Sequence, residues 1–196
     1  MSEVARILVV AATARELAAA DGWLTLQCGV GPVEAAAATA AAIAELKPAA
    51  ILHVGIAGAR RHRAFVPASL VIGSDARYCD INVPVEWAPN SVPASANLLL
   101  VVRRTLPNAP TLSIGTSARV GGTTHCDVEA MEGFGVLRAA QRAGIPAIEV
   151  RAISNDIEEA DRARWHFEAA FSAITAATPR LVHVIAASLT DEPIDA

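Results

Sequence analysis

The sequence is poor in cysteine, clustered charge and long apolar runs, and each shortage excludes a class of protein. Its three cysteines, Cys28, Cys79 and Cys126, form no CxxC pair, which disfavours a disulfide framework and a zinc site. A net charge of -4 without a dense Lys/Arg cluster disfavours nucleic acid as a partner, because phosphate binding needs basic surface. No run reaches the roughly 20 strongly apolar residues of a membrane helix, so we expect no membrane partner.

The length of the chain bounds its organisation. With 196 residues and no long linker, we expect one domain over residues 1–196. Folding at this size buries on the order of 70% of the surface of the extended chain, which allows a sizeable core. The start, Met1-Ser2-Glu3, lacks the basic region of a signal peptide, and this favours a cytoplasmic protein.

Apolar segments rich in Val, Ile and Leu alternate with alanine-rich segments of helical length, which predicts an α/β sheet covered by helices. The predicted strands are residues 6–10, 24–28, 50–54, 66–78 (as one strand or two), 111–114 and 147–153. The predicted helices are residues 33–46, 96–104, 128–143 and 167–189. Within the last of these, Pro179 predicts a kink or a new helix start capped by Thr178.

Polar side chains suited to chemistry follow the predicted strands, at the edge where α/β sheets bind ligands. Thr13 and Glu16 have the spacing of a capping box, and spacing alone favours a purely structural cap. The carboxylate in Met131-Glu132-Gly133 either complements a helix dipole or accepts hydrogen bonds from a vicinal diol. Asn155 follows Ser154, and its ordinary role is that of a turn or helix-capping residue.

Two other polar clusters are expected to have no catalytic role. The side chains of His125-Cys126-Asp127 are consecutive and do not converge on one ion in a helix or a strand, so no metal is expected. The basic run Arg60-Arg61-His62-Arg63 is expected to be a solvated loop after a strand.

Six segments together resemble, in order, the nucleoside phosphorylase and nucleosidase superfamily, and the resemblance extends over nearly the whole chain. They are residues 9–16, 28–36, 53–58, 75–80, 131–133 and 151–155. Within this superfamily, Met131-Glu132-Gly133 paired with Arg151-Ala152-Ile153-Ser154-Asn155 and followed by Asp161-Arg162-Ala163-Arg164-Trp165 resembles the futalosine hydrolase family.

The resemblance implies a three-layer α/β/α fold with a central mixed sheet, no cofactor, and a homodimer or higher homo-oligomer whose subunits often complete each other's sites. It implies that Glu16 is the general base and that Met131 packs under the ribose. Glu132 takes the position that binds the sugar hydroxyls, and Asn155 takes the position of the purine contact.

Hydrolysis is predicted over phosphorolysis at the segment His53-Val54-Gly55-Ile56-Ala57-Gly58. Phosphorylases of the superfamily carry Arg-x-Gly-Ser-x-Gly here, and the Arg and Ser side chains hold phosphate. Ile56 offers no hydrogen bond to an anion, and His53 binds one far more weakly near neutral pH than a guanidinium does. Water is therefore the predicted nucleophile, while His53 is expected to be a core histidine and Ile56 to face the substrate.

The carboxamide of Asn155 predicts a 6-oxopurine base. Adenine-specific members carry Asp at this position, whose second oxygen accepts from the 6-amino group. An amide instead donates to the acceptors of a 6-oxopurine, and mismatched buried polar groups cost about 1 to 3 kcal/mol. Hypoxanthine is therefore the expected base, and the resemblance to the futalosine hydrolase family implies that it is released from futalosine, in the futalosine route to menaquinone. The expected partners are a small nucleoside, water and a second subunit.

Arg119 and Val120 stand where related nucleosidases place an aromatic ring against the base. Arg119 either stacks on the purine, meets the benzoate carboxylate of futalosine, or is an ordinary surface arginine. Three other functions stay open: a methylthioadenosine/S-adenosylhomocysteine nucleosidase, a 6-oxopurine nucleoside phosphorylase, and a non-catalytic nucleoside sensor. Retention of both Glu16 and Glu132 disfavours the sensor.

Overall fold

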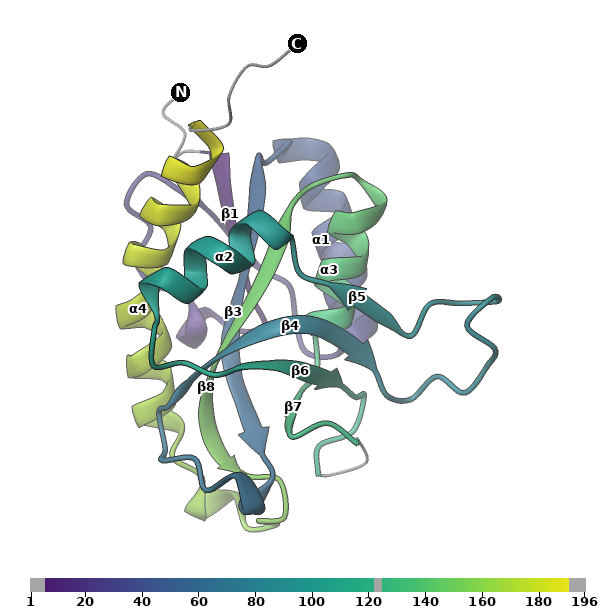
Figure 1. Cartoon of the computed structure of the whole chain (residues 1–196), viewed down its shortest axis with the longest axis vertical. Coiled ribbons are helices and arrows are strands. Elements are labelled where there is room, and N and C mark those ends of the chain that lie inside the picture. The colour runs from purple at the N-terminus through teal and green to yellow at the C-terminus, as the bar shows by residue number, and fades with distance from the viewer. Residues whose placement is uncertain (1–5, 122–124, 191–196) are drawn as a thin grey trace.

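The computed structural model describes residues 6–121 and 125–190, and its strands and helices form three layers (Figure 1). The N-terminal residues on which the cytoplasmic expectation rests lie outside these ranges. The strands are β1 (Ile7–Ala11), β2 (Leu24–Gln27), β3 (Ala50–Ala59), β4 (Leu70–Tyr78), β5 (Ser91–Pro93), β6 (Thr111–Thr116), β7 (Val128–Ala130) and β8 (Ala147–Asp156). The helices are α1 (Pro32–Leu46), α2 (Ala96–Thr105), α3 (Gly133–Arg142) and α4 (Phe167–Thr190), with short 3-10 helices η2 (Ala14–Glu16), η3 (Arg61–Arg63) and η4 (Arg162–Arg164).

The side chains of β1 show how helices cover both faces of the sheet. Ile7, Val9 and Ala11 belong to a core shared with α2 and α4, whereas Leu8 and Val10 belong to a second core shared with α1 and α3. Successive side chains of a strand point to opposite faces, so a strand covered on both sides is apolar throughout. The predicted three-layer α/β/α arrangement with a mixed sheet is confirmed.

The sheet curls until five of its strands close a ring. β8 pairs in parallel with β3 and antiparallel with β4, β4 pairs with β6, and β7 joins β6 back to β3. A third core cluster contains buried residues from these five strands alone: Ala57, Ala59, Val71, Ile114, Val128, Ala130 and Ile153. The ring therefore has its own apolar filling, separate from the two helix-covered faces.

The predicted helix over residues 128–143 is wrong at its start. Val128–Ala130 form β7, and α3 begins only at Gly133. Glu129 pairs with Gly58 on β3 and with Gly115 on β6, so the sheet hydrogen bonds on both sides outweigh helical preference here. Met131 and Glu132 consequently lie in the turn between β7 and α3, at the sheet edge.

Strands β3 and β8 are longer than predicted because they pair with each other along almost their whole length. β3 continues to Ala59, and β8 runs through Asn155 to Asp156. A register shift between Ala57 and Gly58 places Gly58 opposite Asn155. Asn155 is therefore a strand residue beside β3, and the turn or helix-capping alternative does not apply to it.

The new helix start predicted at Pro179 is also wrong, because α4 continues through it. The hydroxyl of Thr178 donates to the carbonyl oxygen of Ile174 at 2.8 Å, one turn earlier. By length and composition α4 is apolar enough to cross a membrane, but one side of it packs in the core, and core helices meet the same criterion. Its buried residues include Ala170, Ile174, Leu181, Val182 and Ile185.

Gly135 allows α1 and α3 to pack closely. A Cβ atom at this position would lie 2.5 Å from the carbonyl oxygen of Pro32 and 3.1 Å from the amide nitrogen of Ala36. We expect Gly135→Ala to lower the free energy of unfolding by about 1 to 3 kcal/mol through overpacking, although alanine favours a helix by about 1 kcal/mol. Urea denaturation measures this, with the exposed Gln141→Ala as control. A gain in stability for Gly135→Ala would contradict the close approach.

Candidate active site

A cavity of about 260 Å³ opens at the edge of the sheet where β1, β3 and β8 end. These three strands run in parallel, so the segments that follow them meet at the same edge. The turn after β7 and the beginning of α4 complete the wall. Val30 after β2 and Val120 and Gly121 after β6 also line it, so the cavity is built from segments distributed along the chain.

The cavity brings together most of the residues predicted to form the site. Its lining includes Glu16, Ile56, Val120, Met131, Glu132 and Asn155. Arg119 is not among the lining residues: it is exposed, and its backbone N–H donates to the hydroxyl of Ser117 at 3.1 Å. Of the roles considered for Arg119, this placement matches the surface arginine.

Glu16 is both a local cap and part of the cavity wall. Its Oε2 accepts hydrogen bonds from the backbone N–H and the hydroxyl of Thr13, at 2.9 and 2.8 Å. Its Oε1 accepts from the backbone N–H of Ile56 at 3.1 Å, which ties η2 to β3. Only 4% of Glu16 is exposed, yet it lines the cavity. The capping box therefore holds the carboxylate rigidly at the edge of the site.

Glu132 reaches the same cavity from the turn between β7 and α3. Its Oε1 accepts from the backbone N–H of Gly31 at 3.1 Å, and its Oε2 lies 3.4 Å from Nη2 of Arg151. Burial raises the pKa of Glu132, although the charge of Arg151 opposes this shift. Each carboxylate oxygen still has lone pairs for a ligand hydroxyl, because an ionised carboxylate has about four acceptor positions.

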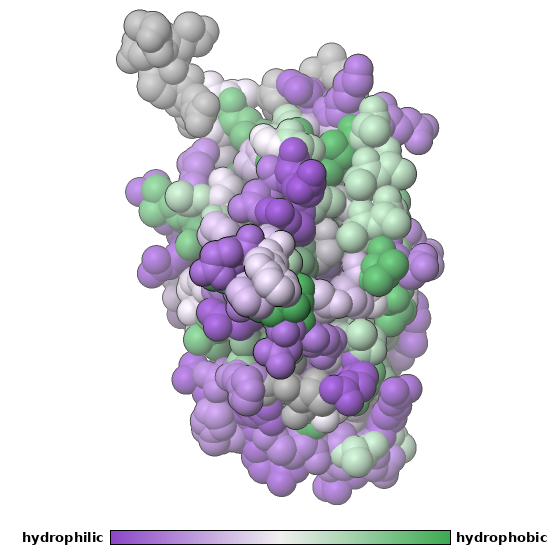
Figure 2. Space-filling model, turned by 90° about the vertical axis from the view of Figure 1, so that its right-hand side faces the viewer, coloured by the Kyte–Doolittle hydropathy of each residue, from purple (hydrophilic) through white to green (hydrophobic). Residues whose placement is uncertain are grey.

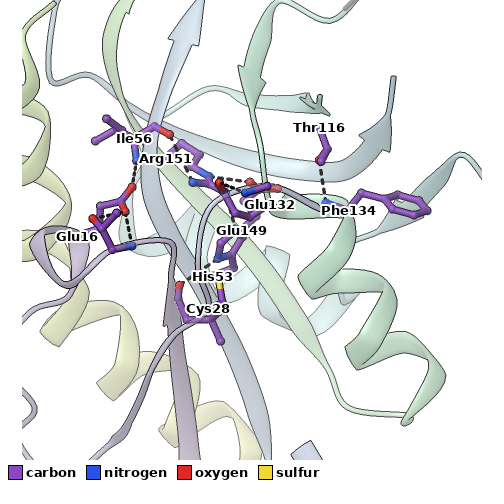
Figure 3. Close-up of polar contacts among 12 residues, drawn as sticks. Glu16, Cys28, His53, Ile56, Thr116, Glu132, Phe134, Glu149 and Arg151 are labelled. Carbon is purple, nitrogen blue, oxygen red and sulfur yellow. Dashed lines mark hydrogen bonds and ion pairs between the residues drawn. The ribbon is translucent and has the colours of Figure 1, made fainter. Parts of the chain in front are cut away.

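Arg151 contacts Glu132 and the backbone of Ile56 but is not among the residues that line the cavity, and it was assigned no role from the sequence. It is fully buried on β8 (Figure 3). Its Nε donates to Oε1 of Glu149 at 2.7 Å, and its Nη1 donates to the carbonyl oxygen of Ile56 at 3.4 Å. Its Nη2 faces both Glu132 and His53. The available signal was the pair Glu149 and Arg151, two residues apart within an apolar strand and so on one face of it.

His53 is the core histidine expected from the sequence, and its neighbours define its state. Its Nδ1 lies 3.0 Å from the carbonyl oxygen of Val10, which only accepts, so Nδ1 carries the proton. Its Nε2 faces the guanidinium of Arg151, which only donates, so Nε2 must accept. Burial and the charge of Arg151 lower the pKa of His53 well below its ordinary value. His53 is therefore neutral and does not supply positive charge to an anion.

Gly55 makes this arrangement sterically possible. A Cβ atom there would overlap Nη1 of Arg151 and would lie 2.8 Å from Oε1 of Glu16. The guanidinium of Arg151 and the carboxylate of Glu16 therefore both lie against the backbone of β3 at Gly55. Gly55 is also the residue that pairs with Arg151 in the register of β3 and β8. Any side chain at position 55 would displace the guanidinium of Arg151 or the carboxylate of Glu16.

The amide of Asn155 has a defined orientation. Its Oδ1 accepts from the hydroxyl of Ser154 at 2.8 Å, and its Nδ2 donates to the carbonyl oxygen of Asp156 at 2.9 Å. Because the carbonyl oxygen of Asp156 only accepts, the nitrogen of the amide must face it, and this assigns the oxygen to the other end. One hydrogen bond uses one of the two N–H groups, so the second is available to a ligand in the cavity.

Three aromatic residues form a wall that was not predicted. The ring centres of Trp165 and Phe167 are 5.4 Å apart, and those of Phe167 and Phe171 are 6.1 Å apart. All three line the cavity. The i, i+4 spacing of Phe167 and Phe171 at the start of a predicted helix was the signal for this wall, because such residues share one helix face.

The charged side chains in the described lining of the cavity are all acidic. Glu16, Glu129 and Glu132 line it, and no Arg, Lys or His is among its described lining residues. Glu129, also missed from the sequence, lies on β7 and accepts at Oε1 from the backbone N–H of Gly121 at 3.3 Å. In residues 6–121 and 125–190, no three His, Cys, Asp or Glu side chains are grouped as metal ligands. Beside these carboxylates, the arrangement favours a neutral polar group, or one on which positive charge develops, over a phosphate anion.

Comparisons with known proteins identify relatives of this chain. Residues 21–190 match the phosphorylase superfamily. A futalosine hydrolase of Streptomyces coelicolor is 34% identical, over 84% of this chain and 80% of that protein. Glu16 precedes the segment that matches the superfamily, so its position at the site rests on the structure.

Two solved structures share the fold. A 5'-methylthioadenosine/S-adenosylhomocysteine nucleosidase from Colwellia psychrerythraea, in complex with adenine, has a TM-score of 0.77 at 17% identity, covering 93% of this chain and 95% of that one. The enzyme of the same name from Neisseria meningitidis has a TM-score of 0.73 at 17% identity, covering 95% and 99%. At this identity the likeness establishes the fold alone.

The raised pKa of Glu132 predicts a pH-dependent stability. In the pH range between the ordinary and the raised pKa, the folded state binds more protons than the unfolded state, so the free energy of unfolding falls as pH rises through it. We expect Glu132→Gln to remove this contribution. Urea denaturation at a series of pH values, starting near the ordinary Glu pKa of about 4.3, should show a smaller loss for Glu132→Gln than for the unmodified protein. Equal losses would contradict the burial of an ionisable Glu132.

Proposed function

The chain belongs to the phosphorylase superfamily, and from that membership we propose that it hydrolyses the N-glycosidic bond of a 6-oxopurine nucleoside. The chain is an N-glycosyl hydrolase by class. Futalosine is the proposed substrate, with hypoxanthine and dehypoxanthine futalosine as products and menaquinone biosynthesis as the pathway. A small nucleoside and water are its reactants, and the proposed location is the cytoplasm.

The acidic, cation-free described lining of the cavity is the observation that supports hydrolysis over phosphorolysis. The backbone N–H of Ile56, where the phosphate motif of phosphorylases lies, already donates to the carboxylate of Glu16 at 3.1 Å. His53, on the same strand, is neutral and fully buried. A phosphate anion at this position would therefore face the carboxylate of Glu16 with no Arg, Lys or His among the described lining residues to bind it, whereas a neutral water is not repelled.

Glu16 is the proposed general base. Its carboxylate is held by Thr13 and Ile56 and lines the cavity, so a water hydrogen-bonded to it is oriented toward the sugar. Deprotonation of this water as it attacks C1' is general-base catalysis, which typically contributes about 100 to 10,000-fold to the rate.

Glu132 is the proposed ligand of the ribose hydroxyls, and Met131 beside it packs under the sugar. The two oxygens of one carboxylate suit a vicinal diol. As the glycosidic bond breaks, positive charge develops on the sugar, and the carboxylates of Glu16, Glu129 and Glu132 are already in position to stabilise it. The acidic lining thus matches the proposed transition state.

Asn155 is the proposed contact of the departing purine. Its free N–H donates to an acceptor of the base, either the 6-oxo group or N7, and stabilises the negative charge that develops there. An amide does not supply a proton, so the role of Asn155 is electrostatic. The absence of a carboxylate at this position favours hypoxanthine over adenine.

The aromatic wall suits the substituent on the 5' carbon of futalosine, which carries a benzoate. An aromatic ring placed against Phe167 and Phe171 would gain both apolar burial and ring stacking. The guanidinium of Arg15 lies 4.5 Å from the ring centre of Phe171, and that of Arg162 lies 5.7 Å from the ring centre of Trp165. These two cations are better placed for the carboxylate than Arg119.

A homodimer is the proposed assembly, supported by an exposed apolar loop. The segment between β4 and β5 projects from the body of the fold (Figure 1). It carries Trp87 and Val85, which are 80% and 59% exposed. Figure 2 faces the side from which this loop projects, and apolar residues are interspersed there with hydrophilic ones. A second copy of the chain would cover these side chains.

The proposed function predicts which nucleosides are cleaved and whether phosphate is needed. We expect base release from futalosine to be fastest, inosine to be slower, and methylthioadenosine and S-adenosylhomocysteine to be cleaved least. We also expect added phosphate to leave every rate unchanged. Chromatographic measurement of the released base decides this. Stimulation by phosphate would identify a phosphorylase, preferential adenine release would identify an adenosine-type nucleosidase, and binding without turnover would identify a sensor.

The roles of Glu16 and Asn155 predict different kinetic defects. We expect Glu16→Gln to lower kcat by about 100 to 10,000-fold, because the water loses its base, while the exposed Glu45→Gln on α1 keeps normal rates. We expect Asn155→Asp to shift the preference from inosine toward adenosine. Steady-state kinetics on both nucleosides measures this. Near-normal turnover by Glu16→Gln would show that another group is the base.

A further inference from the structure

Glu149 is a buried carboxylate that does not line the cavity, and the mechanism above gives it no part. We infer that Glu149 is a positioning residue, which works with Gly133 to fix the guanidinium of Arg151 and thereby the catalytic carboxylates. This inference rests on the proposed function for its kinetic consequences. Its structural basis is independent of the substrate.

Glu149 and Arg151 are neighbours on one face of β8. They are two residues apart in the strand, so their side chains project in the same direction, and both are fully buried. The distance from Nε of Arg151 to Oε1 of Glu149 is 2.7 Å, whereas that from Nη2 to Oε2 of Glu132 is 3.4 Å. The tighter ion pair of Arg151 is therefore the one that lies away from the cavity.

The five N–H groups of a guanidinium lie in one rigid plane, so holding Nε sets the direction of the other four. With Nε held by Glu149, Nη1 faces the carbonyl oxygen of Ile56 and Nη2 faces Glu132. Nη1 also crosses Gly55 next to Oε1 of Glu16. One buried ion pair thus orients the charged edge that faces both proposed catalytic carboxylates (Figure 3).

Gly133 provides the space that Glu149 occupies. A Cβ atom at position 133 would overlap the carboxylate of Glu149, 2.6 Å from its Oε1 and 2.7 Å from its Cδ. Gly133 is the first residue of α3 and directly follows Glu132. The same short turn therefore carries the proposed sugar ligand and leaves room for the residue that positions it.

The charges explain why this position matters for the reaction. If Glu149 were neutral, the carboxylates of Glu132 and Glu16 would be the remaining charged partners of Arg151. The guanidinium would then compete with the sugar hydroxyls and the attacking water for those oxygens. Glu149 balances part of the positive charge of Arg151 from outside the cavity lining. The carboxylates of Glu16 and Glu132 therefore keep more of their negative charge available to the cavity.

The first experiment replaces the charge of Glu149 and keeps its volume. We expect Glu149→Gln to fold and to lower kcat about 100-fold, the size of effect known for small misplacements of catalytic groups. We expect KM to change little, because the loss lies in the transition state. A melting temperature measured alongside identifies the folded protein. Wild-type kcat in Glu149→Gln would overturn the inference.

The second experiment tests the steric partnership with a double-mutant cycle. Gly133→Ala is compared in the unmodified chain and in Glu149→Ala, which removes every atom of residue 149 that the new methyl group would overlap. We expect Gly133→Ala to lower kcat at least 10-fold in the first background and less than about twofold in the second. An equal loss in both backgrounds would overturn the pairing.

The four proteins of this cycle also separate failure of the inference from failure of the proposed function. If the unmodified enzyme releases no base from any nucleoside tested, the proposed function is wrong. The pairing of Gly133 with Glu149 is then read from unfolding in urea, where the effect of Gly133→Ala on the denaturation midpoint should be smaller in the Glu149→Ala background. Equal shifts of the midpoint would overturn the pairing without reference to catalysis.

Discussion

A guanidinium enclosed by protein must be matched by acceptors, since removing one partner of a buried ion pair typically costs about 3 to 5 kcal/mol. Arg151 is in this position, and its four acceptors come from three segments: Glu149 on its own strand, Glu132 before α3, and His53 and the carbonyl of Ile56 on β3. The ends of the strands and the start of α3 are therefore held in one relative placement. The shape of the cavity depends on this constraint.

The topology of the sheet delivers the partners of that charge. β3 and β8 lie side by side in parallel, which sets Gly55 opposite Arg151 and Gly58 opposite Asn155. β7 closes the ring between β6 and β3 and brings the following turn, with Glu132, over the same edge. The result is a cavity whose described charged lining residues are all carboxylates, near a neutral histidine, and the proposed hydrolysis by water suits this charge better than attack by phosphate does. Proposed chemistry and observed charge thus have one structural origin.

Much of this could be read from the residues. The alternation of apolar and alanine-rich segments predicted the α/β layers, and six segments in order carried the resemblance that implied the roles of Glu16, Glu132 and Asn155. Two local readings fail for one reason. Glu129 reads locally as the start of a helix, and Asn155 reads as a turn residue, but both lie in strands because neighbouring strands satisfy their backbone groups. Local propensity does not account for these neighbouring strands, because they are distant in the sequence.

By itself the sequence determined the fold class, the family resemblance and the chemical types available for catalysis, because periodicity and residue identity are properties of the chain. The tertiary structure alone decided which of these groups meet. It excluded Arg119 from the cavity lining, added the aromatic wall of Trp165, Phe167 and Phe171, and placed the buried pair of Glu149 and Arg151 beneath the carboxylates. Those outcomes depend on strand register and on the free space at single glycines, which exist only once distant segments have packed.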